Sequence, residues 1–238
     1  MRALLLRLEA PLMAFGREAI DQNGPTRDHP DASMLTGLLA NALGIRREET
    51  QRLQRLQDRL RFAARIDREG EELRDFQTAQ LGKSDSGWTT HGTPEGRAGG
   101  AGSYAGPHLR FRWYRADAAL TVALTLDTPE ESPTLDDCRA ALDEPVRPLF
   151  IGRKPCLPSG PMAMKIVEAP TMLAALASAP PQERPEAPRR FVLPPEEAEG
   201  VAGAREIKHL TGRRDWIAGV HAGLEERIIV TLPSGGRS

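Results

Sequence analysis

The sequence predicts an α+β protein, a sandwich of helices packed on a sheet, with a long insertion in the first half of the chain. Apolar residues alternate with period two over 61–66 and 117–126, as in strands, and recur with helical spacing over 33–44 and 48–60. Both periodicities are lost between residues 77 and 112. Strands and helices mixed in this way along one chain are typical of the α+β class.

The first elements follow from local signals. A short apolar strand is predicted over 3–8, so the chain starts inside its sheet. We expect Ser33 to cap a helix whose apolar side chains follow i, i+3, i+4 and i+7 spacing and which Gly44 ends. A second helix is predicted from about Glu48 to Arg59, with its leucines buried and its balanced Arg and Glu residues on a solvated face.

The best-defined strand lies further along the chain. Apolar and small residues occupy both faces of Asp117–Leu126, so we expect a central strand covered on both sides. Thr134, followed three residues later by Asp137, resembles a capping box and opens a third helix, which Pro145 ends. The order strand, helix, helix, strand, strand, helix, strand favours a ferredoxin-like or RNA-recognition-motif (RRM) type of sandwich.

The insertion at about 77–112 is the first candidate site. It is rich in Gly, Ser, Thr and Pro, and no acidic residue occurs from Gly96 through Ala116. Such a long irregular segment in a compact domain is functional or disordered. Its cations alternate with planar rings, as single-stranded nucleic acid requires. They are Arg97, His108, Arg110, Arg112 and Arg115, with Trp88, Tyr104, Phe111, Trp113 and Tyr114.

We favour RNA contact for Arg110 and Arg112, with Tyr104 as a stacking ring. The alternative is that Phe111, Trp113 and Tyr114 form the core of the following strand, and we expect at least one of them to do so. The basic tract over 208–214 with Trp216 is a secondary candidate for RNA or partner contact, with a solvated surface as its alternative.

The second candidate site is a basic turn. Residues 147–151 are predicted to form an apolar strand that leads into Gly152 and two cations, Arg153 and Lys154. A glycine frees the backbone and nearby prolines stiffen it, so the turn can hold both cations as a phosphate clamp, with Phe150 beside them. The alternative is a basic surface turn whose charges are simply solvated.

Composition limits the possible classes of protein. With 238 residues, 39% of them hydrophobic, the chain suits one large or two small domains. We divide it into a core over 1–150 and a C-terminal part over 151–238, with a proline-rich linker over 179–195 and accessory strands that include 227–232. A net charge of −1 excludes a uniformly basic coat. We expect two reduced cysteines, no membrane segment and a cytoplasmic location.

Enzyme motifs are absent from the sequence. It has no GxxxxGK[ST], HExxH or GxSxG motif, and its five histidines lie far apart, so we assign no catalytic residue, no cofactor and no metal site. One alternative stays open: His108, near Tyr104 and Arg110, suits metal-independent RNA cleavage.

Five runs of the sequence resemble, in order, the CasD family of the RAMP superfamily. The strongest parts are the Gly-Arg-Lys-x-Cys segment from Gly152 and the Tyr-x-x-Asp-Ala strand start at Tyr114. The runs are Leu6–Gly16, Gly37–Ile45, Leu73–Thr78, Tyr114–Ala118 and Pro148–Lys154.

The resemblance implies an RRM-like core whose insertion is a thumb. It implies a non-catalytic subunit of the type I-E CRISPR Cascade complex, an antiviral ribonucleoprotein, that binds the 5′ handle of crRNA. Backbone, large and small Cascade subunits are the expected partners, target DNA is contacted indirectly, and no membrane is involved. By this resemblance Arg112 and the segment Phe150–Lys154 contact the handle, and Ser33 is an expected RNA contact.

Two residues depart from the family pattern. Gln77 stands where members commonly have His, and Met34 stands where they have Gly, so contacts made there are not carried over. Two other functions remain possible. One is a metal-independent endoribonuclease that processes CRISPR repeat RNA, and the other is a scaffold that binds only protein.

Overall fold

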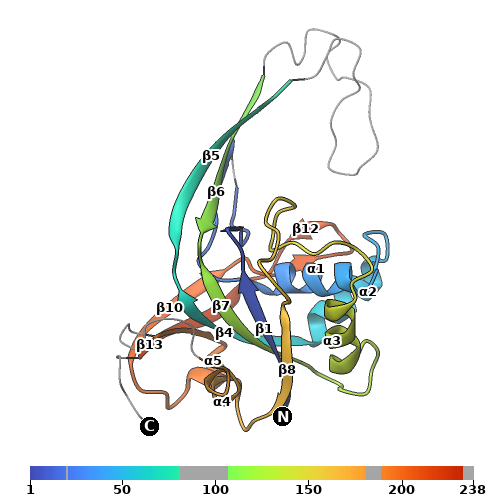
Figure 1. The fold of residues 1–238 in the computed structure, drawn as a ribbon, viewed down its shortest axis with the longest axis vertical. Helices are drawn as coiled ribbons and strands as arrows, with labels where there is room; N and C mark the ends of the chain where they lie inside the picture. The colour runs from blue at the N-terminus through green and yellow to red at the C-terminus, as the bar shows by residue number, and fades with distance from the viewer. Residues whose placement is uncertain (20, 81–106, 181–188, 233–238) are drawn as a thin grey trace.

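The protein is a mixed α/β structure built on one large antiparallel sheet (Figure 1). The computed structural model describes residues 1–19, 21–80, 107–180 and 189–232. The strands are β1 (Arg2–Glu9), β2 (Leu12–Met13), β3 (Asn23–Gly24), β4 (Leu60–Arg68), β5 (Glu71–Ala79), β6 (His108–Ala116), β7 (Ala119–Leu126), β8 (Ala163–Glu168), β9 (Arg189–Leu193), β10 (Ala204–Leu210), β11 (Arg214–Asp215), β12 (Val220–His221) and β13 (Glu225–Leu232). The helices are α1 (Ala32–Ala42), α2 (Thr50–Arg59), α3 (Leu135–Asp143), α4 (Met172–Ala177) and α5 (Pro195–Ala198).

Seven strands form the main sheet, in the order β10-β13-β9-β4-β7-β1-β8. The expected central strand is confirmed, because β7 lies between β4 and β1 and nearly all of its residues are buried. The chain after residue 150 contributes β8, β9, β10 and β13 to this same sheet. Every helix of the described residues is too short or too polar to cross a lipid bilayer.

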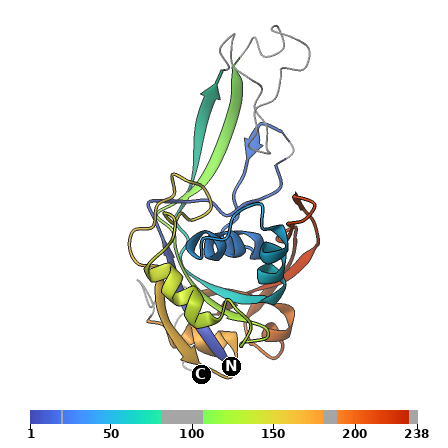
Figure 2. The same ribbon diagram turned by 90° about the vertical axis from the view of Figure 1, so that its right-hand side faces the viewer.

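Helices cover both faces of the sheet (Figure 2). Side chains alternate along β1, so that Leu4, Leu6 and Leu8 share a core with α1, α2 and α3, while Ala3 and Leu5 face α4 and α5. Each fully buried leucine contributes about 1.5–3 kcal/mol, so the two cores fix the sheet between its helices.

Helix α1 begins two residues before the expected position, because its N-cap is residue 31 rather than residue 33. Asp31 is the N-cap: its carboxylate accepts from the backbone N–H of Met34 at 2.8 Å and from the Ser33 hydroxyl at 2.8 Å. Ser33 as the cap was therefore wrong. A carboxylate serves here because Arg27 neutralises Asp31 at 2.8 Å. Gly44, with φ +78°, follows the last turn of the helix as expected.

A long hairpin, β5–β6, extends away from the main sheet (Figure 1). Its pairing runs from Glu71 opposite Ala116 to Ala79 opposite His108, so the outer parts of the expected irregular insertion are strands. Most of β5 is exposed on both faces, and such a strand lacks the apolar alternation from which strands are predicted. Strand β6 also pairs with β2 and, in parallel, with β3.

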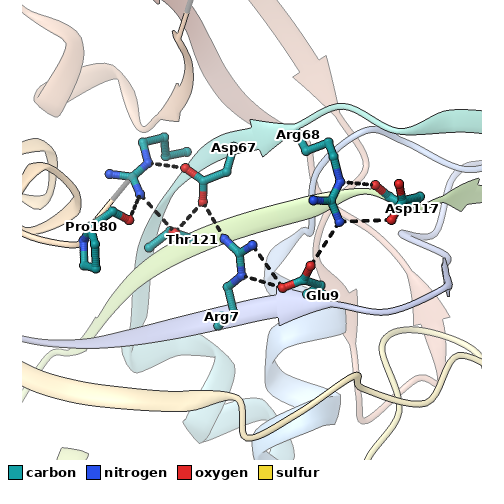
Figure 3. Close-up of polar contacts among 8 residues, drawn as sticks. Arg7, Glu9, Asp67, Arg68, Asp117, Thr121 and Pro180 are labelled. Carbon is teal, nitrogen blue, oxygen red and sulfur yellow. Dashed lines mark hydrogen bonds and ion pairs between the residues drawn. The ribbon is translucent and has the colours of Figure 1, made fainter. Parts of the chain in front are cut away.

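Six charged side chains form a seam at the root of this hairpin (Figure 3). Asp67 is 3.0 Å from Arg7 and also pairs with Arg65, while Arg68 joins Glu9 and Asp117, each at 3.0 Å. Three cations thus face three carboxylates. The pairing offsets the loss of hydration that the buried members of the seam would otherwise suffer. The seam ties β1 and β4 to the residue between β6 and β7 and so fixes where the hairpin starts.

Two sequence-based expectations were wrong in the second half of the chain. Residues 147–151 are a loop rather than a strand, because Pro145 and Pro148 cannot donate to a sheet ladder. Within the expected linker over 179–195, residues 189–193 form β9, a strand paired on both sides with β4 and β13. Three consecutive apolar residues between prolines were enough to fill a central position, with Phe191, Val192 and Leu193 buried.

Candidate nucleic-acid interface

Two guanidinium groups meet beside the middle of the β5–β6 hairpin. Strand β6 presents Arg112 beside Gly24 of β3, its partner in register. Arg153 reaches the same place and donates to the carbonyls of Gly24 at 2.9 Å and Trp113 at 3.0 Å. A Cβ at Gly24 would lie 2.4 Å from Nη1 of Arg112 and 3.3 Å from Nη2 of Arg153. Only glycine fits at position 24, because the two guanidinium groups occupy the space that a side chain would need.

This pair of arginines is not neutralised by the protein. Burial, together with the positive charges of Arg153 and Arg110, lowers the pKa of Arg112. Within the described ranges, neither Arg112 nor Arg153 forms an ion pair, whereas the arginines of the charged seam each have a carboxylate partner. Like charges held together without a counter-ion destabilise the free protein, so this position suits an anionic ligand.

Gly152 determines where Arg153 lies. It has φ +89°, and a Cβ there would lie 1.6 Å from the carbonyl oxygen of Ala14. The loop is held against the strand-β2 segment by the Ala14 N–H, which donates to the Ile151 carbonyl at 3.2 Å, and it closes on itself through Ile151 and Cys156 at 2.8 Å. A glycine at 152 is thus required for the close approach that delivers the Arg153 guanidinium to Gly24.

The two predicted cations of this loop differ in their surroundings. Arg153 is fixed by two backbone carbonyls and lies 4.9 Å from the ring centroid of Tyr114, whereas Lys154 is exposed and forms no ion pair within the described ranges. Arg153 is therefore held in place by the protein, whereas Lys154 is open to solvent. Burial raises the pKa of the neighbouring Cys156 thiol, and both cysteines are free and buried, as expected.

Rings and cations alternate along the hairpin. Phe76 and Phe111 stack across the two strands with centroids 5.1 Å apart, and Trp113 follows at 6.2 Å from Phe111. Tyr114 is buried in the main core, which confirms that at least one of the three rings is a core residue. Arg110 is exposed on β6, two residues from Arg112. Tyr104 lies outside the described residues.

A cavity of about 700 Å³ adjoins the arginine pair. It is lined by residues of α1, the 147–154 loop and the β11–β12 hairpin, and much of this lining is apolar. Three residues expected in the basic turn line it, Phe150, Gly152 and Arg153, and Ser33 lines it from α1. The arginines on its wall are Arg46, Arg47, Arg147, Arg153 and Arg214, and its carboxylates are Asp31 and Glu48.

Sequence reasoning missed part of this wall. Arg46 and Arg47 come just after Gly44, the glycine that ends α1. Two adjacent cations at a helix end are the sequence signal that could have identified them. Trp216 and Arg214 had been considered only as a secondary surface. In the structure, Trp216 is held on α2 by Gln57, whose Oε1 accepts from the indole Nε1 at 3.2 Å. Among the described residues, no group of three potential metal-ligating side chains occurs.

Comparisons with known proteins agree on one family. A family model described as CRISPR-associated protein (Cas_Cas5) matches residues 3–226. The CRISPR system Cascade subunit CasD of Escherichia coli (strain K12) is 30% identical over 187 residues, which cover 75% of this chain and 77% of that protein.

Solved structures are similar in fold. One is a chain of a CRISPR RNA-guided surveillance complex, with a TM-score of 0.65, 24% identity, and coverage of 98% of this chain and 90% of that one. Another, described as a crystal structure of a Cas protein, has a TM-score of 0.58, 26% identity, and coverage of 98% and 95%. The family model spans nearly the whole chain, so this protein belongs to the Cas5 family of CRISPR-associated proteins.

Proposed function

We propose that this chain is a non-catalytic subunit of a type I-E CRISPR Cascade complex, where it binds and caps the 5′ handle of crRNA in antiviral defence. Membership of the Cas5 family and the similarity to a Cascade subunit support this assignment. The structural observation that carries it is the un-neutralised pair of Arg112 and Arg153 over Gly24, because RNA supplies the phosphates that such a pair lacks.

The finer fold assignment belongs to the same proposal. The sheet with α1, α2 and α3 is the ferredoxin-like or RRM-type core, and the β5–β6 hairpin is the base of a thumb that contains the rest of the insertion. The exposed rings and apolar side chains of this hairpin suit contact with a neighbouring backbone subunit, and the large and small subunits dock elsewhere on the chain. Its location is the cytoplasm, where crRNA is held.

In this proposal each group has a distinct role. Arg153 and Arg112 hold one phosphodiester, and the exposed Lys154 and Arg110 track its neighbours along the strand. Phe150, at the cavity, stacks on an unpaired base, a contact worth about 1–3 kcal/mol, and Tyr104 is proposed as a further ring on the thumb. Gly152 allows the backbone to approach the RNA closely, and Ser33 contributes a short polar side chain.

The test measures binding of single-stranded RNA copied from the CRISPR repeat encoded beside the gene, across a series of salt concentrations. For single strands the slope of log K against log salt is about −0.7 per phosphate contact. We expect Arg112→Ala and Lys154→Ala each to flatten the slope by about 0.7, while Arg139→Ala, which removes an exposed cation of α3, leaves it unchanged. Equal slopes for all of these variants would refute RNA binding at this site.

The same RNA, incubated in EDTA, tests the absence of catalysis. The proposal predicts intact RNA after prolonged incubation with the protein. Site-specific cleavage that disappears in His108→Ala would instead assign the chain as a metal-independent endoribonuclease.

A further inference from the structure

The cavity is also lined by a second group of cations that the proposed RNA contacts do not use. Arg47 comes from the turn after α1, and Arg214 comes from β11, so segments far apart in sequence bring them to the same wall. Burial and the positive charge of Arg47 lower the pKa of Arg214. In the described ranges of the chain, neither guanidinium forms an ion pair, and the same holds for Arg112 and Arg153.

Two contacts hold the Arg214 side chain in place. Its guanidinium lies 5.3 Å from the ring centroid of Trp216 and donates to the Gly219 carbonyl. The edge of the Trp216 ring approaches Gly37 of α1, where a Cβ would lie 4.0 Å from Cη2 of the indole. These contacts fix the Arg214 guanidinium at the wall of the cavity, where a guanidinium can bind a phosphate through two N–H groups.

The cavity as a whole is more cationic than its own carboxylates can balance. Five arginines line it, and within the described residues none of the five is ion-paired. Arg147 is used structurally, because it donates to Asn41 and to the Ile45 carbonyl at the end of α1. Of the two carboxylates, Asp31 is already neutralised by Arg27. The remaining positive charge comes from Arg153, which lies beside Arg112, and from Arg46, Arg47 and Arg214, of which Arg47 and Arg214 lie close together.

We propose that Arg47 and Arg214 bind a second phosphodiester of the same RNA strand, and that the cavity between them and Arg153 receives the intervening nucleotide. This inference rests on the proposed function, since it extends the same bound strand. The volume of about 700 Å³ lies in the range of ligand pockets, and a largely apolar lining with two groups of cations suits a nucleotide flanked by two phosphates. An acidic protein segment is the competing occupant, but the continuity of the cavity with Arg153 favours RNA.

The test compares Arg47→Ala and the double variant Arg47→Ala/Arg214→Ala with a matched two-charge control, Arg139→Ala/Lys165→Ala. The control residues are exposed on α3 and β8 and do not line the cavity. With repeat-derived single-stranded RNA, the double variant is expected to bind about tenfold or more weakly and to show a slope flatter by about 0.7. The control is expected to match the wild type.

If the double variant unfolds, the single variant Arg47→Ala still tests the inference. Arg47 is exposed, and replacing it removes no contact within the β11–β12 hairpin. It should also weaken RNA binding. Wild-type affinity and slope for Arg47→Ala, alongside a loss in Arg112→Ala, would overturn this inference and leave the proposed function standing. No salt-dependent RNA binding by the wild type would overturn both. Unchanged RNA binding with lost association to a sister subunit would assign the Arg47–Arg214 pair to a protein partner.

Discussion

Gly152→Ala tests most directly whether the 147–154 loop depends on a glycine. A Cβ at this position would lie 1.6 Å from the Ala14 carbonyl oxygen, and side-chain carbons essentially never approach other atoms closer than 3.0 Å, so the loop must move by more than an ångström. Alanine at φ +89° adds about 1–2 kcal/mol of backbone strain. Losing two hydrogen bonds, such as those of Arg153 to Gly24 and Trp113, adds about 1 kcal/mol each.

The expected loss of unfolding free energy is therefore about 3–4 kcal/mol, measured by urea denaturation. RNA affinity is expected to fall as well, because the displaced loop withdraws Arg153 from Arg112. Gly160→Ala is the matched control: Gly160 lies in the same region of the chain, has no positive φ, and its Cβ would meet nothing within 4 Å. If Gly152→Ala proves as stable as Gly160→Ala, then the close approach to Ala14 does not hold the loop in place.

Two further predictions concern buried charges. Asp67→Asn removes the carboxylate partner of Arg7 and Arg65, so it should lower the unfolding free energy by about 3–5 kcal/mol. The control is Asp136→Asn, which changes an exposed ion pair and should cost less than about 1 kcal/mol. Equal urea midpoints for the two variants would contradict the role of the seam. Burial lowers the pKa of His29 in the folded protein. Below about pH 6.5 this histidine is protonated in the unfolded chain and still neutral in the folded one, so the unfolding free energy should fall as the pH drops. His29→Gln should lessen that fall between pH 6.5 and 5, and an unchanged pH profile would show that His29 does not contribute.

Local signals in the sequence predicted local structure well. The Thr134–Asp137 capping box is formed in full, and the end of α1 at Gly44 follows from a glycine that accepts positive φ. The predictions failed where a distant partner decided the outcome. Asp31 replaces Ser33 as the cap because Arg27 stands beside it, and β9 forms because β4 and β13 present open edges to a short apolar segment.

The candidate site divides in the same way. Arg112 and Arg153 were identified because cations next to rings and glycines suggest a phosphate site, and the structure brings the two together over Gly24. The distant cavity wall was not predictable, because Arg47 and Arg214 lie far apart in sequence and meet only when the β11–β12 hairpin packs on α1 and α2. A like-charge pair of this kind leaves no periodic or motif signal in a sequence.

The most direct test of the central claim is to isolate the protein under native conditions from the cells that encode it and to sequence the RNA that accompanies it. The account predicts one class of short RNA that shares a common 5′ sequence derived from the CRISPR repeat, recovered together with other Cas proteins. Recovery of the protein free of RNA and of sister subunits would contradict it.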